Sequence, residues 1–132
     1  MKLAALLFLL WLPLVTGCLA PYQPAVGNAD GYLDDEVSPR VYQVRFQFNP
    51  TTLFPYRRPS FQELVLLRAA DLTLEQGYRY FIVDKALLPG DSWGGYSLTI
   101  KVFAESPSSS SVKVYDARDI TTQIRSTHSH LK

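Results

Sequence analysis

Hydrophobic and polar residues alternate along two stretches of the chain, residues 41–48 and 97–105. Such a period of two places apolar side chains on one face of a β-strand and polar side chains on the other. Two further stretches, residues 79–84 and 112–115, combine aromatic and β-branched residues, a composition typical of strands. The pattern therefore predicts four strands. The first of them has the predicted buried face Tyr42, Val44, Phe46 and Phe48.

A helix is predicted between Ser60 and Gly77. Ser60 and Glu63 have the spacing of a capping box, and Gly77 is placed to end the helix in the left-handed conformation. Apolar residues occupy most of the helical wheel between these ends, so we expect the helix to be buried over much of its circumference. Arg68 and Asp71 lie three residues apart in the narrow polar sector, where they can form an ion pair.

The order of the elements predicts the fold class. A short last helix over residues 117–124, capped by Asp116, follows the fourth strand. The order strand, helix, strand, strand, strand, short helix is that of an α+β domain over residues 41–125. We expect one main helix packed on a mainly antiparallel four-stranded sheet, in which the first crossover could make one pair parallel. Residues 126–132 are expected to be a polar, frayed tail.

The first seventeen residues have the pattern of a signal peptide. Lys2 supplies a positive charge and residues 3–14 are apolar except for Pro13. About 12 residues are too few to cross a bilayer core that needs about 20 in a helix, so this is not a lasting transmembrane segment. We expect residues 1–17 to be removed.

Residues 15–18, Val-Thr-Gly-Cys, resemble a bacterial lipobox. The resemblance implies that lipid is attached to Cys18 and that the chain is cut between Gly17 and Cys18. Leu19 follows the cysteine, and by resemblance to enteric lipoproteins this favours the outer membrane, facing the periplasm, over the inner membrane. The alternative is an ordinary secretory signal with a chance cysteine.

Residues 18–40 are expected to form a lipidated cysteine and a flexible tether. They contain three prolines, two glycines and the acidic run Asp34-Asp35-Glu36, and they have no sustained apolar period. A flexible coil of this length spans about 25 Å. The domain should therefore work near the membrane that anchors it.

Several short segments resemble a family of small proteobacterial envelope lipoproteins. They are residues 21–24 (Pro-Tyr-Gln-Pro), Gly31-Tyr32, residues 67–78 (LRAADLTLEQGY), Tyr80-Phe81 and residues 114–119 (VYDARD). The sequence departs from the family pattern at Asp71, where glutamate is usual, and in the proline-containing residues 48–59. The resemblance implies a location and an architecture, and it brings no activity because none is established for the family.

Charge and cysteine content exclude several classes of function. The chain has 13 Lys and Arg residues, and removal of Lys2 leaves 12 against 12 Asp and Glu residues, without a basic patch for nucleic acid. Cys18 is the sole cysteine, so an intrachain disulfide is impossible. His128 and His130 lie in the predicted tail, where they cannot hold a catalytic or metal-binding geometry. We predict no catalytic residue, cofactor or metal.

Aromatic residues are the remaining candidates for binding. An exposed stacking surface could be formed by Tyr78, Tyr80, Trp93, Tyr96 and Tyr115, although strand propensity explains most of these positions. Trp93 lies in a glycine-containing loop, and we take Trp93 and Tyr96 as the candidate binding surface.

The hypothesis that the sequence favours is a non-catalytic binding or assembly module. Its partner would be an envelope protein or a cell-wall polymer near the membrane. One alternative is an enzyme that acts on envelope polymers through a cleft lined by acids, or by His and Ser. The other is a small-ligand sensor that uses the loop from Trp93 to Tyr96 as a lid.

Overall fold

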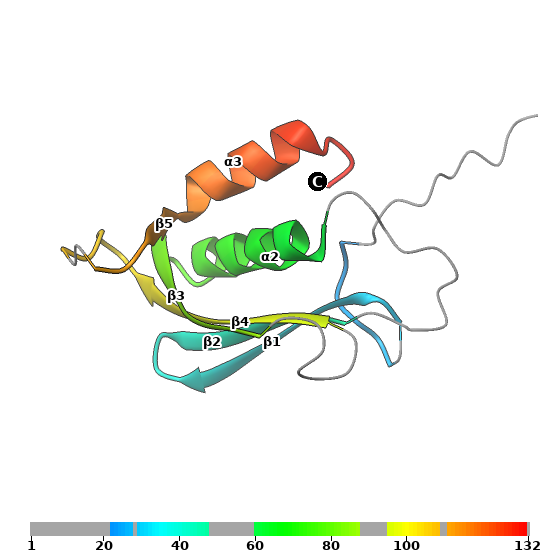
Figure 1. Cartoon of the computed structure of the whole chain (residues 1–132), viewed down its shortest axis with the longest axis horizontal. Helices are drawn as coiled ribbons and strands as arrows, with labels where there is room; N and C mark the ends of the chain where they lie inside the picture. The colour runs from blue at the N-terminus through cyan, green and yellow to red at the C-terminus, as the bar shows by residue number, and fades with distance from the viewer. Residues whose placement is uncertain (1–21, 28, 48–59, 88–94, 109–110, 132) are drawn as a thin grey trace, which may run out of the picture.

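The computed structural model describes residues 22–27, 29–47, 60–87, 95–108 and 111–131. They form five strands and two helices, shown with their labels in Figure 1. The strands are β1 (Gly31–Ser38), β2 (Val41–Gln47), β3 (Tyr80–Leu87), β4 (Gly95–Phe103) and β5 (Val114–Asp116), and the helices are α2 (Phe61–Glu75) and α3 (Ala117–Thr127). The predicted signal peptide, Gly17, Cys18, Phe48 and Trp93 lie outside the described residues.

The strands form one open sheet in the order β1-β2-β4-β3-β5, and every neighbouring pair among them is antiparallel. This confirms the predicted α+β class. The crossover through α2 connects β2 to β3, but β4 lies between these two strands in the sheet. The parallel pair that the crossover could have made is therefore replaced by two antiparallel pairs.

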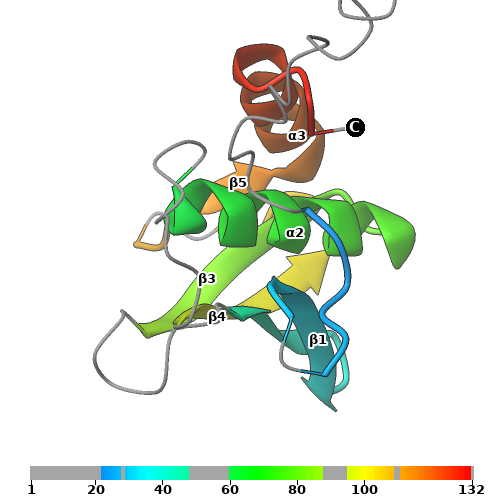
Figure 2. The ribbon, with the colours of Figure 1, turned by 90° about the vertical axis from the view of Figure 1, so that its right-hand side faces the viewer.

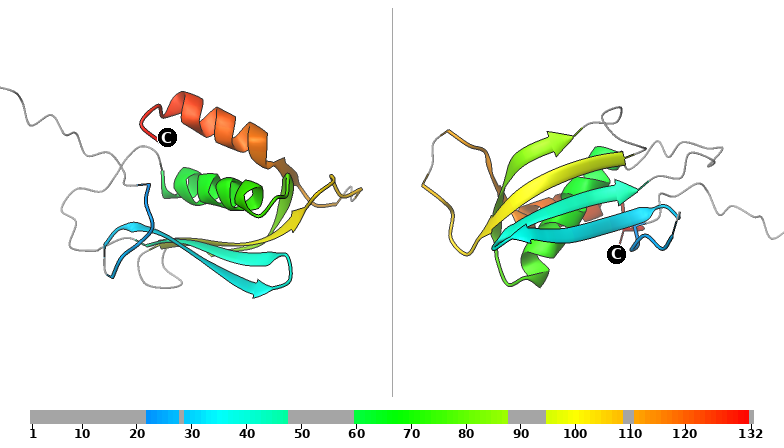
Figure 3. Two further views of the ribbon diagram at one scale, coloured as in Figure 1. Left: turned by 180° about the vertical axis from the view of Figure 1, so that it is seen from behind. Right: turned by 90° about the horizontal axis from the view of Figure 1, so that it is seen from below.

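Both helices lie on the same side of the sheet. Figure 1 shows α2 across the sheet and α3 above α2, and Figure 2 shows the same three layers from the end. The opposite face of the sheet, seen in the right panel of Figure 3, carries no helix of the described chain. A one-sided arrangement of this kind matches the alternation of buried and exposed residues along β2.

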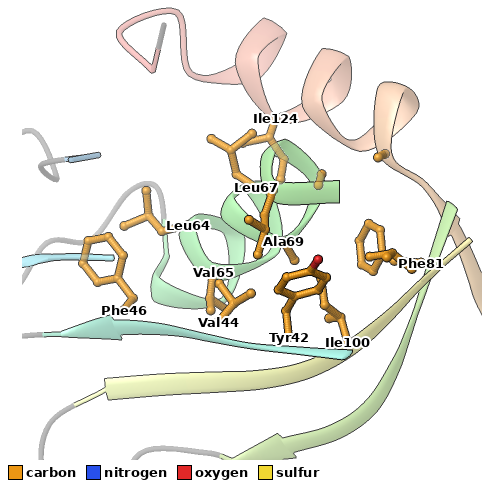
Figure 4. Close-up of a cluster of buried hydrophobic side chains, with 14 of the residues drawn as sticks. Tyr42, Val44, Phe46, Leu64, Val65, Leu67, Ala69, Phe81, Ile100 and Ile124 are labelled. Carbon is orange, nitrogen blue, oxygen red and sulfur yellow. The ribbon is translucent and has the colours of Figure 1, made fainter. Parts of the chain in front are cut away.

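The hydrophobic core lies between α2 and the sheet and continues between α2 and α3, where Ile124 of α3 joins it (Figure 4). The predicted inner face of β2 is confirmed, because Tyr42, Val44 and Phe46 are buried. Helix α2 contributes side chains from most of its circumference, also as expected. Its fully enclosed members are Leu64, Leu67, Ala69 and Ala70.

The predicted ends of α2 are confirmed. The Ser60 hydroxyl accepts a hydrogen bond from the amide of Glu63, and the Glu63 carboxylate accepts one from the Ser60 amide. Gly77 has φ +82°, the left-handed conformation that glycine adopts without a Cβ penalty. Asp116 caps α3 by accepting a hydrogen bond from the Arg118 amide.

Strand β1 lies where the sequence led us to expect a flexible tether, so that prediction was wrong for residues 31–38. The acidic run that suggested a solvated coil is paired instead. Asp34 binds Arg68 of α2 and Asp35 binds Arg45 of β2. Because these arginines neutralise the carboxylates, the segment pairs with β2 along its length as an edge strand.

The predicted frayed tail is also wrong for the residues described. Helix α3 continues beyond the predicted Ile124 to Thr127, and Leu131 is only 2% exposed. The amide of His128 donates to the carbonyl of Ile124, and the Arg125 Nε donates to the carbonyl of Leu131. These contacts fold the last residues back onto the domain.

Candidate functional site

An apolar groove lies beside the N-terminal half of α2, on the side of the sheet that carries β3 and β5. Its volume is about 240 Å³. Nearly all of its lining side chains are apolar or aromatic, and they come from four elements: Gln62, Val65, Leu66, Val83, Ala86, Leu87, Tyr96, Leu98 and Tyr115. Ala86 of β3 and Leu98 of β4 are register partners, and both line the groove.

Two tyrosines border the groove. Tyr115 stacks on Phe81 with ring centroids 5.1 Å apart and planes at 10°, and the Lys113 amine lies 4.7 Å from its ring centroid. Tyr96 lies on β4 opposite Phe46 of β2 and is half-buried. Tyr96 and Tyr115 therefore add to the lining two side chains that combine an apolar ring with a polar hydroxyl.

The opposite side of α2 carries a cluster that holds the start of the described chain, and we call it the N-terminal clamp: Tyr22, Asp71 and Arg125. The Tyr22 hydroxyl donates to Asp71 Oδ2 at 2.5 Å. Both amino groups of the Arg125 guanidinium donate to the Asp71 carboxylate, at 2.7 and 2.8 Å. Burial first, and then the hydrogen bond and charge of Asp71, raise the pKa of Tyr22 far above its ordinary value, so its proton stays on the hydroxyl.

Arg68 forms a second cluster next to the clamp. Its guanidinium donates to Asp34 of β1 and to Glu75 of α2, and it lies 4.2 Å from the ring centroid of Tyr32. Burial disfavours the charge of Arg68, but the bonds and attraction of the two carboxylates outweigh it and raise its pKa. Arg68 thus pairs with Asp34 and Glu75 rather than with the expected Asp71.

Backbone contacts complete the attachment of the N-terminal segment. The Ala25 amide donates to the carbonyl of Tyr32, and the Tyr32 amide donates to the carbonyl of Gln23. Gly31 allows this close approach, since a Cβ there would lie 2.5 Å from the Gln23 carbonyl oxygen. Gln47 further donates to the carbonyls of Gly27 and Ala29.

The structure separates the predicted aromatic surface. Of the two candidate residues, Tyr96 borders the groove, whereas Trp93 lies outside the described residues. Tyr78 packs against the core, and Tyr80 lies beside the Arg79 guanidinium, 5.3 Å away. Of the described members of the expected set, Tyr96 and Tyr115 line the groove and Tyr78 and Tyr80 do not.

The predicted site residues at the N-terminus, Gly17 and Cys18, lie outside the described residues. Within those residues no helix is long and apolar enough to cross a membrane. No group of three or more His, Cys, Asp or Glu side chains in the described chain could hold a metal ion. His128 lies 3.3 Å from Glu63 and packs edge-on to His130.

Sequence reasoning missed the partners that matter most, Tyr22, Asp34 and Arg125. The nearest signal was the segment around Tyr22, whose proline and tyrosine residues resemble a family pattern without indicating a contact. Comparison with protein-family models, curated proteins and solved structures found no match. The resemblance to envelope lipoproteins therefore stays a prediction.

Proposed function

We propose that this protein is a lipid-anchored, non-catalytic binding module of the bacterial cell envelope. In this proposal, lipid on Cys18 holds it in the membrane, and the groove beside α2 binds an apolar segment of an envelope protein. Membership of the envelope lipoprotein family and an outer-membrane location facing the periplasm belong to the same proposal. The observation that carries the binding role is the groove, whose lining is almost entirely apolar.

The chemistry of the groove favours a protein partner over a cell-wall polymer. A glycan buries many hydroxyls and amides, and each buried polar group needs a hydrogen-bond partner. Among the described lining residues, the polar side chains are those of Gln62, with its amide, and of Tyr96 and Tyr115, with their hydroxyls. Leucine, isoleucine or phenylalanine side chains of a protein need no such partners, and anchors of this kind dominate many interfaces.

The size of the groove favours side chains over a free small ligand. Pockets for drug-sized ligands and cofactors have volumes of about 300–1,000 Å³. This groove has about 240 Å³ and leads to the surface between α2 and the sheet. It accommodates one or two side chains presented by a partner, which argues against the sensor alternative.

The acidic residues of the described chain support the non-catalytic role. A general acid and base pair needs two carboxyl groups that face one cleft. Asp34 and Asp71 are each bound by an arginine on the other side of the helix from the groove, and Asp116, next to the groove residue Tyr115, is bound by Arg79. Their geometry is that of structural ion pairs.

Site-specific photocrosslinking in intact cells tests the groove. A photoreactive phenylalanine derivative replaces Tyr96 at the groove, or Tyr80 as a matched control on the same sheet. We expect a discrete envelope protein to be captured from position 96, and its yield to fall severalfold when Ala86→Lys places a charge in the lining. Identical products from both positions, or products that Ala86→Lys leaves unchanged, would overturn the binding site.

The anchor is tested separately with Cys18→Ser. Without the thiol there is no site for diacylglyceryl transfer, so we expect an uncut precursor or a soluble protein. Mass spectrometry of the N-terminal peptide and membrane fractionation measure both outcomes. A variant that still fractionates with membranes at the mature size would contradict lipid anchoring.

A further inference from the structure

We infer that the folded domain is fastened directly against the membrane surface, with the end that carries Tyr22 and the C-terminal end of α3 facing the lipid headgroups. The inference rests on the proposed lipid anchor at Cys18. It changes the expected picture of a domain on a flexible tether of about 25 Å into one of a domain with a fixed membrane-facing end.

The chain becomes part of the domain at Tyr22. This residue packs against the core and against Tyr32, with ring centroids 5.2 Å apart. Its hydroxyl is bound to Asp71, which Arg125 holds in turn. From Tyr22 onward the chain is therefore held by side chains of both helices.

The residues between Tyr22 and β1 are held against the domain by hydrogen bonds. A parallel bridge joins Pro24 to Tyr32, with hydrogen bonds to the backbone of Tyr32 on either side of it. Gly27 and Ala29 are bound by the Gln47 side chain. The segment that precedes β1 is thus attached at its beginning, middle and end, and the expected tether contributes no reach beyond Tyr22.

The reach that remains between Cys18 and Tyr22 is short. Only three residues, 19–21, separate them. However these residues are arranged, four Cα-to-Cα steps span at most about 14 Å. Acyl chains on Cys18 lie in the bilayer and give stable anchoring. Tyr22 is therefore confined to the headgroup region or its immediate edge.

The two ends of the domain differ in their distance from this anchor, which sets the orientation. The described chain begins at the same end of the molecule as residues 128–131, which follow α3, whereas residues 104–108, which follow β4, lie at the other end (Figures 1 and 3). The nine residues of β4 separate these ends by about 30 Å. A domain fastened at one end within about 14 Å of the bilayer keeps that end toward the lipid.

Energy transfer in lipid vesicles tests this orientation with the full lipidated protein. Ser129→Cys and Ser106→Cys are matched exposed positions, one at each end, and Cys18 is blocked by its lipid. A donor dye on the new cysteine transfers energy to acceptor dyes on the headgroups. We expect severalfold stronger transfer from position 129 than from position 106. A long Gly-Ser linker inserted between residues 20 and 21 should remove most of this difference.

Equal transfer from the two positions in protein whose lipidation is verified by mass spectrometry would overturn the inference while leaving the anchor intact. A strong difference that the linker leaves unchanged would overturn it as well, because the short spacing would then not be its cause. If mass spectrometry shows no lipid on Cys18, the anchor fails and this inference fails with it. Crosslinking at the groove does not depend on either result.

Discussion

The two sides of helix α2 differ in whether their described side chains have found partners within the domain. On the side toward β1 and α3, Arg68 and Asp71 hold bidentate partners, and every buried side-chain nitrogen or oxygen of the described chain has a hydrogen-bond partner. On the side toward β3 and β5, the helix borders a groove of about 240 Å³ with an apolar lining. One side is closed by charge pairing, and the other leaves apolar surface open to the outside.

This difference separates residues that stabilise the fold from residues that are available to bind a partner. The charged residues on this side form ion pairs and hydrogen bonds with one another. These interactions stabilise the packing of β1, α2, α3 and the segment before β1. Apolar surface in the groove remains in contact with water until a partner removes it. Substitutions on the charged side should therefore change stability, and substitutions in the groove should change binding.

The largest effect is expected for Arg68→Ala. The Arg68 side chain is 9% exposed and that of Asp34 is 19% exposed, so the substitution leaves a poorly hydrated carboxylate without its partner. We expect the free energy of unfolding to fall by about 3 kcal/mol. Urea denaturation of the protein produced without residues 1–18 measures it.

Glu75→Gln provides the matched control for Arg68→Ala. The Glu75 side chain is 53% exposed, so water replaces much of what the ion pair contributes. The expected loss is below about 1 kcal/mol. Equal losses for the two variants would mean that the charged side is an exposed surface cluster rather than a closed one.

Gly31→Ala should have the next largest effect. The new Cβ would lie 2.5 Å from the Gln23 carbonyl oxygen and 2.6 Å from the Ala25 nitrogen, so backbone must move. We expect a loss of about 2 kcal/mol, together with faster hydrogen exchange at the amides of Ala25 and Tyr32. Hydrogen-exchange mass spectrometry detects both.

Gly27→Ala distinguishes the steric clash of a Cβ at position 31 from the conformational strain of alanine at a positive φ. Gly27 has φ +59° but nothing within 4 Å of a Cβ, so alanine there carries only the conformational penalty of about 1 kcal/mol. The exchange rates of Ala25 and Tyr32 should stay near those of the parent protein. If Gly27→Ala released these amides as strongly as Gly31→Ala, close packing against β1 would not explain the attachment.

The contrast between the two sides also explains what the sequence could and could not predict. Strand β2 and helix α2 were predicted because their signals are local: alternation at Tyr42, Val44 and Phe46, and the Ser60–Glu63 capping box. Strand β1 was missed because its acidic residues look like those of a coil when read alone. The partner that makes Asp34 part of a sheet is 34 residues away, at Arg68.

The groove could not be predicted for a related reason. It depends on β4 lying between β2 and β3, an order that no single segment encodes. Tyr96 was selected for its aromatic character, but its neighbours in the groove, Val65 and Ala86, have the character of ordinary core or strand residues. The clamp likewise joins Tyr22 to Asp71 across 49 residues.

A smaller effect on stability is expected when acid protonates Glu63. This residue lies in the first turn of α2 and contacts His128. The hydrogen bond from the Ser60 amide is the main reason that the pKa of Glu63 is lowered from 4.5, and His128 adds to it against the effect of burial. A carboxyl group with a lowered folded pKa stabilises the fold above its unfolded pKa and loses that contribution as the pH falls through the folded value. Stability should thus decline below about pH 4.5.

Thermal melting across this range, with Glu63→Gln as the comparison, measures the contribution of Glu63. The variant should be less stable at neutral pH and should lose less stability on acidification than the parent. Because the Glu63 side chain is 42% exposed, the difference should be smaller than that caused by Gly31→Ala. Parallel pH profiles for parent and variant would show that Glu63 does not contribute.

The smallest effect on stability is expected for Ala86→Lys in the groove. Ala86 is exposed on β3, so a lysine there can extend its amine into water and displace no buried contact. We expect the free energy of unfolding to change by no more than about 0.5 kcal/mol. Partner capture should fall severalfold in the same protein, because the lysine side chain then stands where the apolar side chains of the partner enter the groove and brings its charge next to them. If Ala86→Lys instead destabilised the domain as much as Arg68→Ala, the groove would be part of the core. The two sides of α2 would then not differ in their roles in stability and in partner binding.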